Sequence, residues 1–531
     1  SQVSKRTVMG RRGTIYDRRG RVLATTRTAQ RLFVDPYLIE ERSTFSARVG
    51  YSLGYDPVWV EKTLFQHPRS RYIVLDHRLS PQRLEQFHQL NLPGLAVEPV
   101  LVRDYPHGTL AGQLLGFVNR EGQGGEGVEM KFNARLRPKP GRLTYLRDAQ
   151  GRPLWVRTDA YQPHEDGESI RLSIDITIQA IAQKYLAQTV QEYGAQSGQI
   201  IIMQPYTGEI LAMANVPEFD PNHYNQSKPE DWRNRAVTDM FEPGSIFKPF
   251  IWAAATQMGV AKPEELIDCT TRGWWKPARG PILRDAHPNG LLTWEQVLIK
   301  SSNIGMGKVG ERLGVQKLHQ IITAFGFGRS TGSGLPGEVG GLVRSPENWS
   351  ATDITRVTMG QGVAVTPLQM VRAFCAIAND GFLVTPMILA AQPDAAQAVP
   401  IQERVLLPSI AAYTRSVLGR VVVEGTGRKA NSSLYALFGK TGTAQLPDLE
   451  HGGYLPDGYV SSFIAGAPLD APQLVVGCFI HHPDKKKGHY GGIVAAPAVK
   501  QVMEESLMYL GVPPQTVPRQ LPPPTQLVLD D

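Results

Sequence analysis

Residues 242–249 read Glu-Pro-Gly-Ser-Ile-Phe-Lys-Pro, and this stretch decides how the rest of the sequence is interpreted. Pro243-Gly244 is a turn signal, so we expect a helix to begin at Ser245, with Pro249 in or just after its first turn. Ser245 and Lys248 then share one helix face. A serine needs a base to become a nucleophile, and lysine can serve only when it is kept neutral. Taken alone, such a pair is more often a capping serine beside a solvated lysine.

A second short motif, Ser301-Ser302-Asn303, follows an apolar helical run at residues 294–300. A loop at the end of a helix could present a hydroxyl and an amide to a cleft. Ser301 could relay a proton, and Asn303 could bind a substrate amide or hold Lys248. The structural alternative is an Asx or ST turn, which would be favoured if the motif stood alone.

A third motif, Lys440-Thr441-Gly442-Thr443, reads as a strand beside a cleft. Lys440 can bind an anion, and the hydroxyls of Thr441 and Thr443 can hold a carboxylate. Gly442 permits close backbone approach by a substrate. The structural alternative is an edge strand protected by a charged residue. The ordered set of three motifs is characteristic of penicillin-binding proteins and the related β-lactamases.

The 531 residues are enough for two or more domains. We predict an N-terminal domain over residues 1–165, a second domain over 166–512 and a Pro-rich, disordered tail over 513–531. The net charge of +7 is small for this length, and no nucleic-acid-binding signature occurs. Three widely spaced cysteines allow at most one disulfide, and no metal-binding pair is present.

The second domain has readable elements at both of its ends. Residues 178–193 carry apolar side chains with helical periodicity, and residues 199–213 form a clear hairpin. Strands are expected at 459–465 and 473–480, and an amphipathic helix at 499–510. We therefore expect one sheet assembled from the two ends, with a mostly helical insertion between them.

Beyond the three motifs, the sequence resembles class B penicillin-binding proteins from about residue 10 to residue 510. The stretches that carry the resemblance are 12–18, 20, 23–24, 103–106, 116, 127–129, 234–245, 290–294, 360–362, 365–369, 490–492 and 495–497. The resemblance implies an α/β transpeptidase fold: a five-stranded antiparallel sheet between helices, an all-helical subdomain and a β-rich N-terminal pedestal domain. It also implies an N-terminal membrane anchor outside this chain and a periplasmic or extracytoplasmic catalytic domain.

By this resemblance, Ser245 attacks the penultimate D-Ala of a peptidoglycan stem peptide, with Lys248 as base and Ser301 as proton relay. Asn303 and Lys440 complete the catalytic set. The terminal carboxylate would be held by Lys440, Thr441 and Thr443, and the backbone N–H groups of Ser245 and Thr443 would form the oxyanion hole. An amine from a second stem peptide would then take the acyl group. β-Lactams would acylate Ser245, and neither cofactor nor metal is required.

Several alternatives remain at this stage. A class A β-lactamase needs a Glu-x-x-x-Asn loop, and no glutamate between residues 264 and 424 has asparagine four positions on. A D,D-carboxypeptidase, a penicillin sensor and a division scaffold stay open. We expect the cell-division type, working with a membrane glycosyltransferase and divisome proteins. The basic run Lys485-Lys486-Lys487, with its neighbouring histidines, is interpreted as a solvated loop near the cleft.

Overall fold

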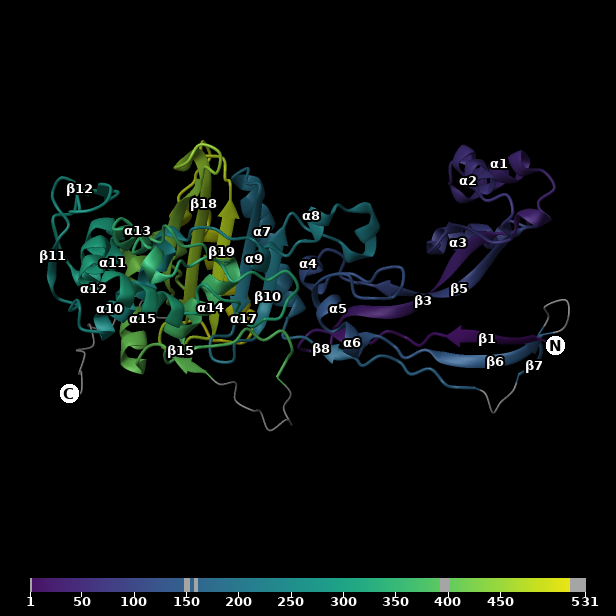
Figure 1. Ribbon diagram of the computed structural model, residues 1–531, viewed down its shortest axis with the longest axis horizontal. Coiled ribbons are helices and arrows are strands. Elements are labelled where there is room, and N and C mark those ends of the chain that lie inside the picture. The colour runs from purple at the N-terminus through teal and green to yellow at the C-terminus, as the bar shows by residue number, and fades with distance from the viewer. Residues whose placement is uncertain (1, 148–152, 157–160, 392–401, 516–531) are drawn as a thin grey trace. The chain divides into compact units, whose positions relative to one another are not determined.

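The computed structural model describes residues 2–147, 153–156, 161–391 and 402–515 (Figure 1). The chain contains two compact units that alternate along the sequence. The first comprises residues 1–15, 22–106 and 134–169, and the second comprises 16–21, 107–133 and 170–531. The linear boundary at residue 166 stays a prediction. Most of the predicted tail, residues 516–531, lies outside the described residues.

The first unit combines strands with helices. Strand β3 (Val22–Val34) pairs antiparallel with both β4 (Ile73–Asp76) and β5 (Leu95–Asp104). The core around this sheet also takes in α1 (Arg42–Leu53), with α2 (Pro57–Gln66) and α3 (Pro81–Gln89) packed nearby. A second sheet contains β1 (Gln2–Val8), β6 (Gly141–Arg147) and β7 (Pro153–Val156).

The helices of this unit were not predicted from the sequence, whose family resemblance implied a β-rich domain. Their starts carry local signals. In α2 (Pro57–Gln66) the Asp56 side chain caps the first turn, and in α3 (Pro81–Gln89) the Ser80 side chain does so. Both helices have proline at the first position, where the absent N–H is harmless. An acid or serine followed by proline was the available clue.

The second unit is built on a five-stranded antiparallel sheet in the order β10-β9-β19-β18-β17, as expected (Figure 1). The bounds are β9 (Ser197–Met203), β10 (Ile210–Val216), β17 (Phe438–Pro447), β18 (Tyr454–Ala467) and β19 (Leu474–His481). The predicted hairpin forms β9 and β10, and the two late strands form β18 and β19. Strands from residues 197–216 and 438–481 thus meet in one sheet, with β17 at its edge.

Helices cover both faces of this sheet. On one face, α7 (Ile176–Glu192) and α17 (Ala496–Tyr509) pack into a fully buried apolar core with side chains of β9 and β19. On the other face, α14 (Pro367–Ala378) lies against β9 and β19, where Val371 fills the space beside Gly477. Burial on both faces explains why these strands read as continuous apolar runs rather than alternating ones.

The insertion between β10 and β17 is mainly helical. Its longer helices are α10 (Lys248–Gln257), α11 (Trp294–Ile299), α12 (Asn303–Ala324), α13 (Asp353–Val357), α14 and α15 (Pro408–Glu424). Two small hairpins, β11 (Leu266–Asp268) with β14 (Leu291–Thr293) and β12 (Trp274–Trp275) with β13 (Leu283–Arg284), lie between α10 and α11. No helix in the described ranges combines the length and hydropathy needed to cross a bilayer.

A buried ionic cluster ties the start of α7 to residues 16–21 of the same unit. The Arg21 guanidinium lies 2.8 Å from Asp17 Oδ2 and 2.8 Å from Asp175 Oδ1. Asp175 also caps α7 by accepting from the N–H groups of Thr177 and Ile178, and it accepts from the Tyr509 hydroxyl at 3.1 Å. The cluster therefore joins three segments that are far apart in the sequence.

Candidate active site

Ser245 stands on a turn that is fixed by packing of its backbone. Gly244 has φ +64, and its N–H donates to the carbonyl of Gly360 at 3.0 Å. Residues Gly244–Phe247 form one turn of 3₁₀ helix that runs into α10 at Lys248. The predicted helix start is thus a 3₁₀ turn, with the α-helix beginning three residues later and Pro249 in its first turn. Ser245 stays half-buried, whereas Lys248 is fully buried.

The Lys248 ammonium is held by the second motif. Its Nζ lies 2.8 Å from the Ser301 carbonyl, 3.0 Å from Ser301 Oγ and 2.7 Å from Asn303 Oδ1. Burial lowers the pKa of Lys248 to about 7, while the charge of Asp285 acts in the opposite direction. A large fraction of Lys248 is therefore neutral near neutral pH, as a general base requires.

The second motif links α11 and α12. Ser302 is the N-cap of α12 and accepts from the Gly305 N–H, so this serine has a local structural role, although as a helix cap rather than in the Asx or ST turn considered from the sequence. Ser301, directly before it, has φ +58, a conformation that is uncommon for residues other than glycine. In this conformation the carbonyl and the hydroxyl of Ser301 both accept from Lys248 Nζ. One motif therefore combines a capping residue with two residues that face the lysine.

Lys440 reaches the same hydroxyl from the sheet. Its Nζ lies 3.0 Å from Ser301 Oγ and 3.1 Å from the Thr441 carbonyl, and its side chain is fully buried on the edge strand β17. Burial and the charge of Lys248 lower the pKa of Lys440 well below its usual value. The alternative of an exposed gatekeeper on an edge strand does not fit a buried side chain.

The threonines of the third motif are held from the flanking segments. Thr441 Oγ1 lies 2.8 Å from Thr426 Oγ1, and Thr443 Oγ1 accepts from the Gly491 N–H at 2.9 Å. Gly442 faces a crowded space, because a Cβ there would lie 2.8 Å from Ile246 Cγ2 and 2.9 Å from Ser462 Oγ. The glycine allows β17 to approach the Ser245 turn.

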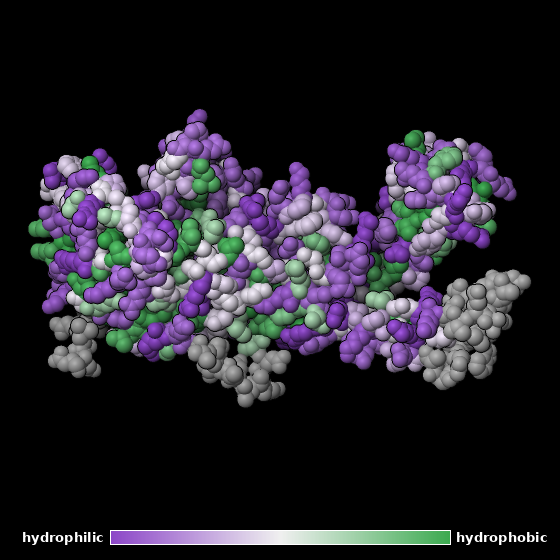
Figure 2. Space-filling view, viewed as in Figure 1, coloured by the Kyte–Doolittle hydropathy of each residue, from purple (hydrophilic) through white to green (hydrophobic). Residues whose placement is uncertain are grey.

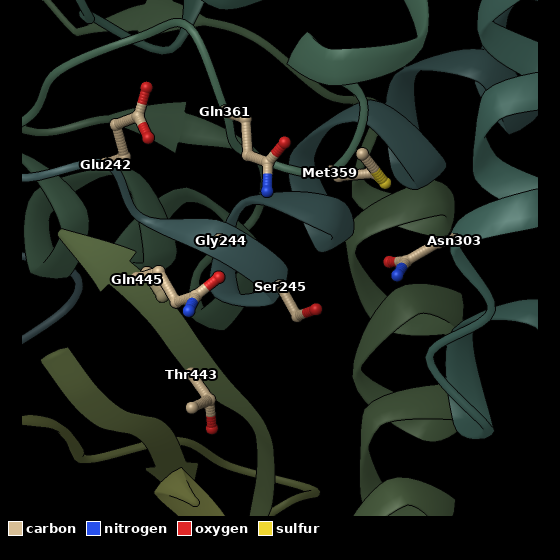
Figure 3. A pocket seen from close by; sticks show the side chains of 9 residues that line it. Glu242, Gly244, Ser245, Asn303, Met359, Gln361, Thr443 and Gln445 are labelled. Carbon is tan, nitrogen blue, oxygen red and sulfur yellow. The ribbon is translucent and has the colours of Figure 1, made fainter. Parts of the chain in front are cut away.

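These motifs surround one pocket (Figure 3). Figure 3 shows Ser245 between the strand that carries Thr443 and the residue Asn303, with Met359 and Gln361 lining the opposite side. The full lining is Glu242, Gly244, Ser245, Asn303, Met359, Gln361, Thr443, Ala444 and Gln445. The Ser245 hydroxyl makes no hydrogen bond with the part of the chain that the structure describes, and it faces this pocket.

Several pocket residues were not predicted as site residues. Glu242, Met359, Gln361 and Gln445 line the pocket, and Thr426 supports the third motif. Glu242 and Gln361 lie inside stretches that carried the family resemblance, which was the available signal. Met359, Thr426 and Gln445 come together with Ser245 only through folding.

The remaining candidates lie outside this pocket. Lys485, Lys486 and Lys487 are exposed, whereas burial lowers the pKa of His481 to about 4. Among the described residues, no group of three or more His, Cys, Asp or Glu side chains is arranged to hold a metal ion. The three cysteines are buried and unpaired, so the disulfide left open by the sequence is not formed.

The outermost part of the β17–β18 hairpin, at residues 448–453, is largely hydrophilic (Figure 2). Tyr454 begins the return strand, and its hydroxyl accepts from Arg356 at 3.0 Å. Arg356 belongs to α13, which precedes the pocket residues Met359 and Gln361. The hairpin is thereby attached to the segment that lines the pocket.

Two family descriptions match the chain. Residues 198–504 match the penicillin-binding protein transpeptidase domain, and residues 7–172 match the penicillin-binding protein dimerisation domain. The chain is 32% identical to the probable peptidoglycan D,D-transpeptidase PenA of Neisseria meningitidis, over 96% of this chain and 87% of that protein. It is 31% identical to the peptidoglycan D,D-transpeptidase FtsI of Escherichia coli, over 95% of this chain and 85% of FtsI.

Solved structures agree with these matches. Penicillin-binding protein 3 from Mycobacterium tuberculosis, complexed with aztreonam, superposes with a TM-score of 0.74 at 27% identity and covers 98% of this chain and 99% of that chain. A further sequence relative is stage V sporulation protein D of Bacillus subtilis, which is 34% identical over 95% of this chain and 79% of its own length.

The chain therefore belongs to the class B penicillin-binding proteins, a family of serine-type peptidoglycan D,D-transpeptidases.

Proposed function

We propose that Ser245 is the nucleophile of peptidoglycan cross-linking in this protein and that Lys248 is its base. The observation that carries the proposal is the buried Lys248 amine, which has a pKa of about 7 and lies one helical turn from a pocket-facing serine. Catalytic bases work best when their pKa lies near the operating pH. A surface lysine would be protonated at that pH and could not accept the serine proton.

The first half-reaction forms an acyl-enzyme. Ser245 Oγ attacks the carbonyl carbon of the penultimate D-Ala while Lys248 takes the hydroxyl proton. The C–O bond to Ser245 forms and the C–N bond to the terminal D-Ala breaks. The leaving amine needs a proton, and Ser301 Oγ can pass one because it lies within 3.0 Å of both Lys248 Nζ and Lys440 Nζ.

Substrate binding uses the edge strand. Thr441, Thr443 and Lys440 are assigned to the terminal carboxylate of the stem peptide or of a β-lactam. The backbone N–H groups of Ser245 and Thr443 are assigned to the oxyanion, where loss of one donor typically costs roughly 10²–10³-fold in kcat. Asn303 holds Lys248 and is available to a substrate amide.

The second half-reaction releases the product. An amine of a second stem peptide attacks the ester carbonyl, the new C–N bond forms and the C–O bond to Ser245 breaks. Lys248 takes one proton from the attacking amine and passes it to Ser245 Oγ as the ester bond breaks, which restores the serine hydroxyl and the neutral lysine. β-Lactams enter the first half-reaction, but the ring opens without losing its amine, so the adduct blocks the acceptor.

The finer assignment is septal cell-wall synthesis. Similarity to FtsI of Escherichia coli and to stage V sporulation protein D of Bacillus subtilis supports it. We place the catalytic unit on the extracytoplasmic side of a bacterial membrane, anchored N-terminally. A membrane glycosyltransferase and divisome proteins are its proposed partners.

The test is intact-protein mass spectrometry after incubation with benzylpenicillin, with peptide mapping and with Ser245→Ala as the matched control. We expect one stable adduct on the peptide that contains Ser245 and no adduct on the variant. Adduct on the variant would remove Ser245 as nucleophile. Rapid loss of the wild-type adduct would instead indicate a hydrolase.

A second assay separates a transpeptidase from a carboxypeptidase or a sensor. A thioester analogue of the stem peptide is supplied with and without a D-amino acid as acceptor amine. A transpeptidase forms the new amide, a carboxypeptidase forms only the hydrolysed acid, and a sensor turns over neither. Amide formation that requires Ser245 would support the proposal.

A further inference from the structure

A carboxylate outside the three motifs contacts the second motif. Asp285 follows β13 in the small β12–β13 hairpin. Its Oδ2 accepts from the Ser302 hydroxyl at 2.6 Å and from Asn289 Nδ2 at 3.0 Å, and its Oδ1 accepts from the Ile304 N–H at 3.1 Å. Asp285 therefore binds Ser302, the residue between Ser301 and Asn303, and also the first turn of α12.

The neighbouring backbone fixes the Asn303 side chain. Asn303 Nδ2 donates to the Arg284 carbonyl at 2.8 Å, which turns its Oδ1 toward Lys248 Nζ at 2.7 Å. An amide that donates to one side must present its oxygen to the other. Residues 284 and 285 thus determine how both Ser301–Asn303 and the Lys248 amine are oriented.

Asp285 also contributes charge. Burial lowers the pKa of Lys248, and the negative charge of Asp285 is the influence that raises it. Without an opposing charge, burial makes a lysine neutral but also a weaker base. Asp285 makes no hydrogen bond to Lys248, so it acts on the amine through space and through the motif that it orients.

We propose that Asp285 is a positioning residue for transpeptidation, which holds Ser301–Asn303 in place and supplies the negative charge that keeps Lys248 a strong base. The inference rests on the proposed role of Lys248. It assigns to the β12–β13 hairpin a part in acylation, although none of its residues lines the pocket.

Other charged and titratable groups also face this region. Lys440 on β17 shares the Ser301 hydroxyl with Lys248. Cys269 after β11 lies near both Asp285 and Lys308 of α12, and burial raises the pKa of the Cys269 thiol. Lys440 acts against the Lys248 charge, whereas Asp285 acts for it. Removing the Asp285 charge should therefore lower the pKa of Lys248.

The experiment is the pH profile of acylation by a fluorescent penicillin, from pH 5 to pH 9, for wild type and Asp285→Asn. Asparagine keeps the shape and the acceptor for the Ile304 N–H, but it removes the charge and replaces the oxygen that accepts from Ser302 and Asn289 with an NH₂ group. We expect a lower plateau and an acidic limb displaced to lower pH. If the acidic limb of wild type has its midpoint near pH 7, the acylation rate at pH 6 is about one-tenth of the plateau rate. If the midpoint of Asp285→Asn lies about one pH unit lower, its rate at pH 6 is about half of its own plateau rate.

Two controls separate charge from packing. Asp268→Asn removes the same charge from the exposed end of β11, where the carboxylate accepts from the Thr270 N–H at 2.9 Å, and it should leave both the acidic limb and the plateau unchanged. Ser302→Ala loses the hydrogen bond but keeps the Asp285 charge, so the plateau should fall while the limb stays in place.

If the acidic limb of the pH profile is unchanged in Asp285→Asn while wild type is acylated at Ser245, the role of Asp285 is overturned and the proposed function stands. Absence of wild-type acylation at Ser245 would overturn the proposed function instead. Thermal unfolding checks that the variants fold. If Asp285→Asn does not fold, Asp285→Ser carries the same comparison, because its hydroxyl still accepts a hydrogen bond without charge.

Discussion

Two buried charged clusters in the second unit are built on opposite rules. At the start of α7, the Arg21 guanidinium is paired with Asp17 and Asp175, both 0% exposed. In the active site, Lys248 and Lys440 are also 0% exposed, yet they share a hydroxyl with each other, and the described residues give neither an ion pair.

The pKa directions follow from this difference. Hydrogen bonds and the charge of Arg21 outweigh burial and lower the pKa of Asp17, and Asp17 and Asp175 raise that of Arg21, so these charges persist. For the lysines, burial dominates and lowers both pKa values. Two unpaired ionisable amines buried in an interior cost stability, and groups with such strongly shifted pKa values concentrate at functional sites. We therefore expect the first cluster to control folding and the second to control chemistry.

The largest effect expected is that of Lys248→Met. Removing the base should lower the second-order acylation constant for benzylpenicillin by about 10³-fold, within the usual range for general-base loss. Stability should stay the same or rise, because methionine fills a similar volume without a buried amine. Stopped-flow acylation and urea unfolding measure the two quantities. A Lys248→Met variant that acylates normally, or that loses stability strongly, would break the contrast between the clusters.

Asp175→Ala should give the converse result. It leaves the partly exposed Arg21 paired with Asp17 alone and removes the cap of α7, which together should cost about 2 kcal/mol of unfolding free energy. Acylation measured at 25 °C should remain within about twofold, because the cluster touches no residue of the pocket. Asp457→Asn is the control, since that carboxylate is exposed and its contact with Lys485 is 3.6 Å long. Equal stability of the two variants would contradict the prediction.

Lys440→Ala probes the anion-binding half of the lysine pair. We expect acylation by penicillins with a free carboxylate to fall by about 10–100-fold, comparable to the loss of one charged hydrogen bond. The methyl ester of the same penicillin lacks the carboxylate and should lose far less. Parallel rate measurements on the acid and the ester give the ratio. The same loss for both compounds would count against an anion-binding role of Lys440.

Local patterns located the motifs but not their surroundings. Ser245 and Lys248, the loop at 301–303 and the strand that contains Lys440 could all be identified because each motif is contiguous and its neighbours signal helix, turn or strand. Their convergence on one pocket could be expected only from the family resemblance. Lys440 lies on an edge strand but is buried, so it does not fit the alternative of a charged residue that protects the edge.

The parts that were not predicted depend on contacts between distant segments. The capping of α7 by Asp175 is a local contact, but the pairing of Asp175 with Arg21 joins residues that lie 154 positions apart. Asp285 reaches Ser302 through a hairpin of two-residue strands, which is too short to show alternation. Periodicity describes one element at a time, so it could not reveal either contact.

The pH dependence of stability gives a further contrast between the two clusters. Lys248 has a folded pKa of about 7 and an unfolded pKa of about 10.4, so the unfolded chain binds the extra proton between these values. Stability should therefore rise with pH in this window, by roughly 1 kcal/mol per pH unit for one such group. Asp17 has the same sign of linkage but the opposite effect at neutral pH: its lowered pKa contributes stability above the unfolded value of about 3.9, which is lost as pH falls further.

Urea unfolding of wild type and Lys248→Met at pH 7, 8 and 9 measures the first of these slopes. Groups that titrate elsewhere in the chain contribute equally to both proteins, so the difference between them isolates Lys248. The gap in favour of Lys248→Met should narrow as pH rises, because the wild-type amine no longer has to lose a proton in order to fold. A constant gap would mean that Lys248 folds as an ammonium, and the base of the acylation step would then have to be Lys440, the other buried amine on the Ser301 hydroxyl.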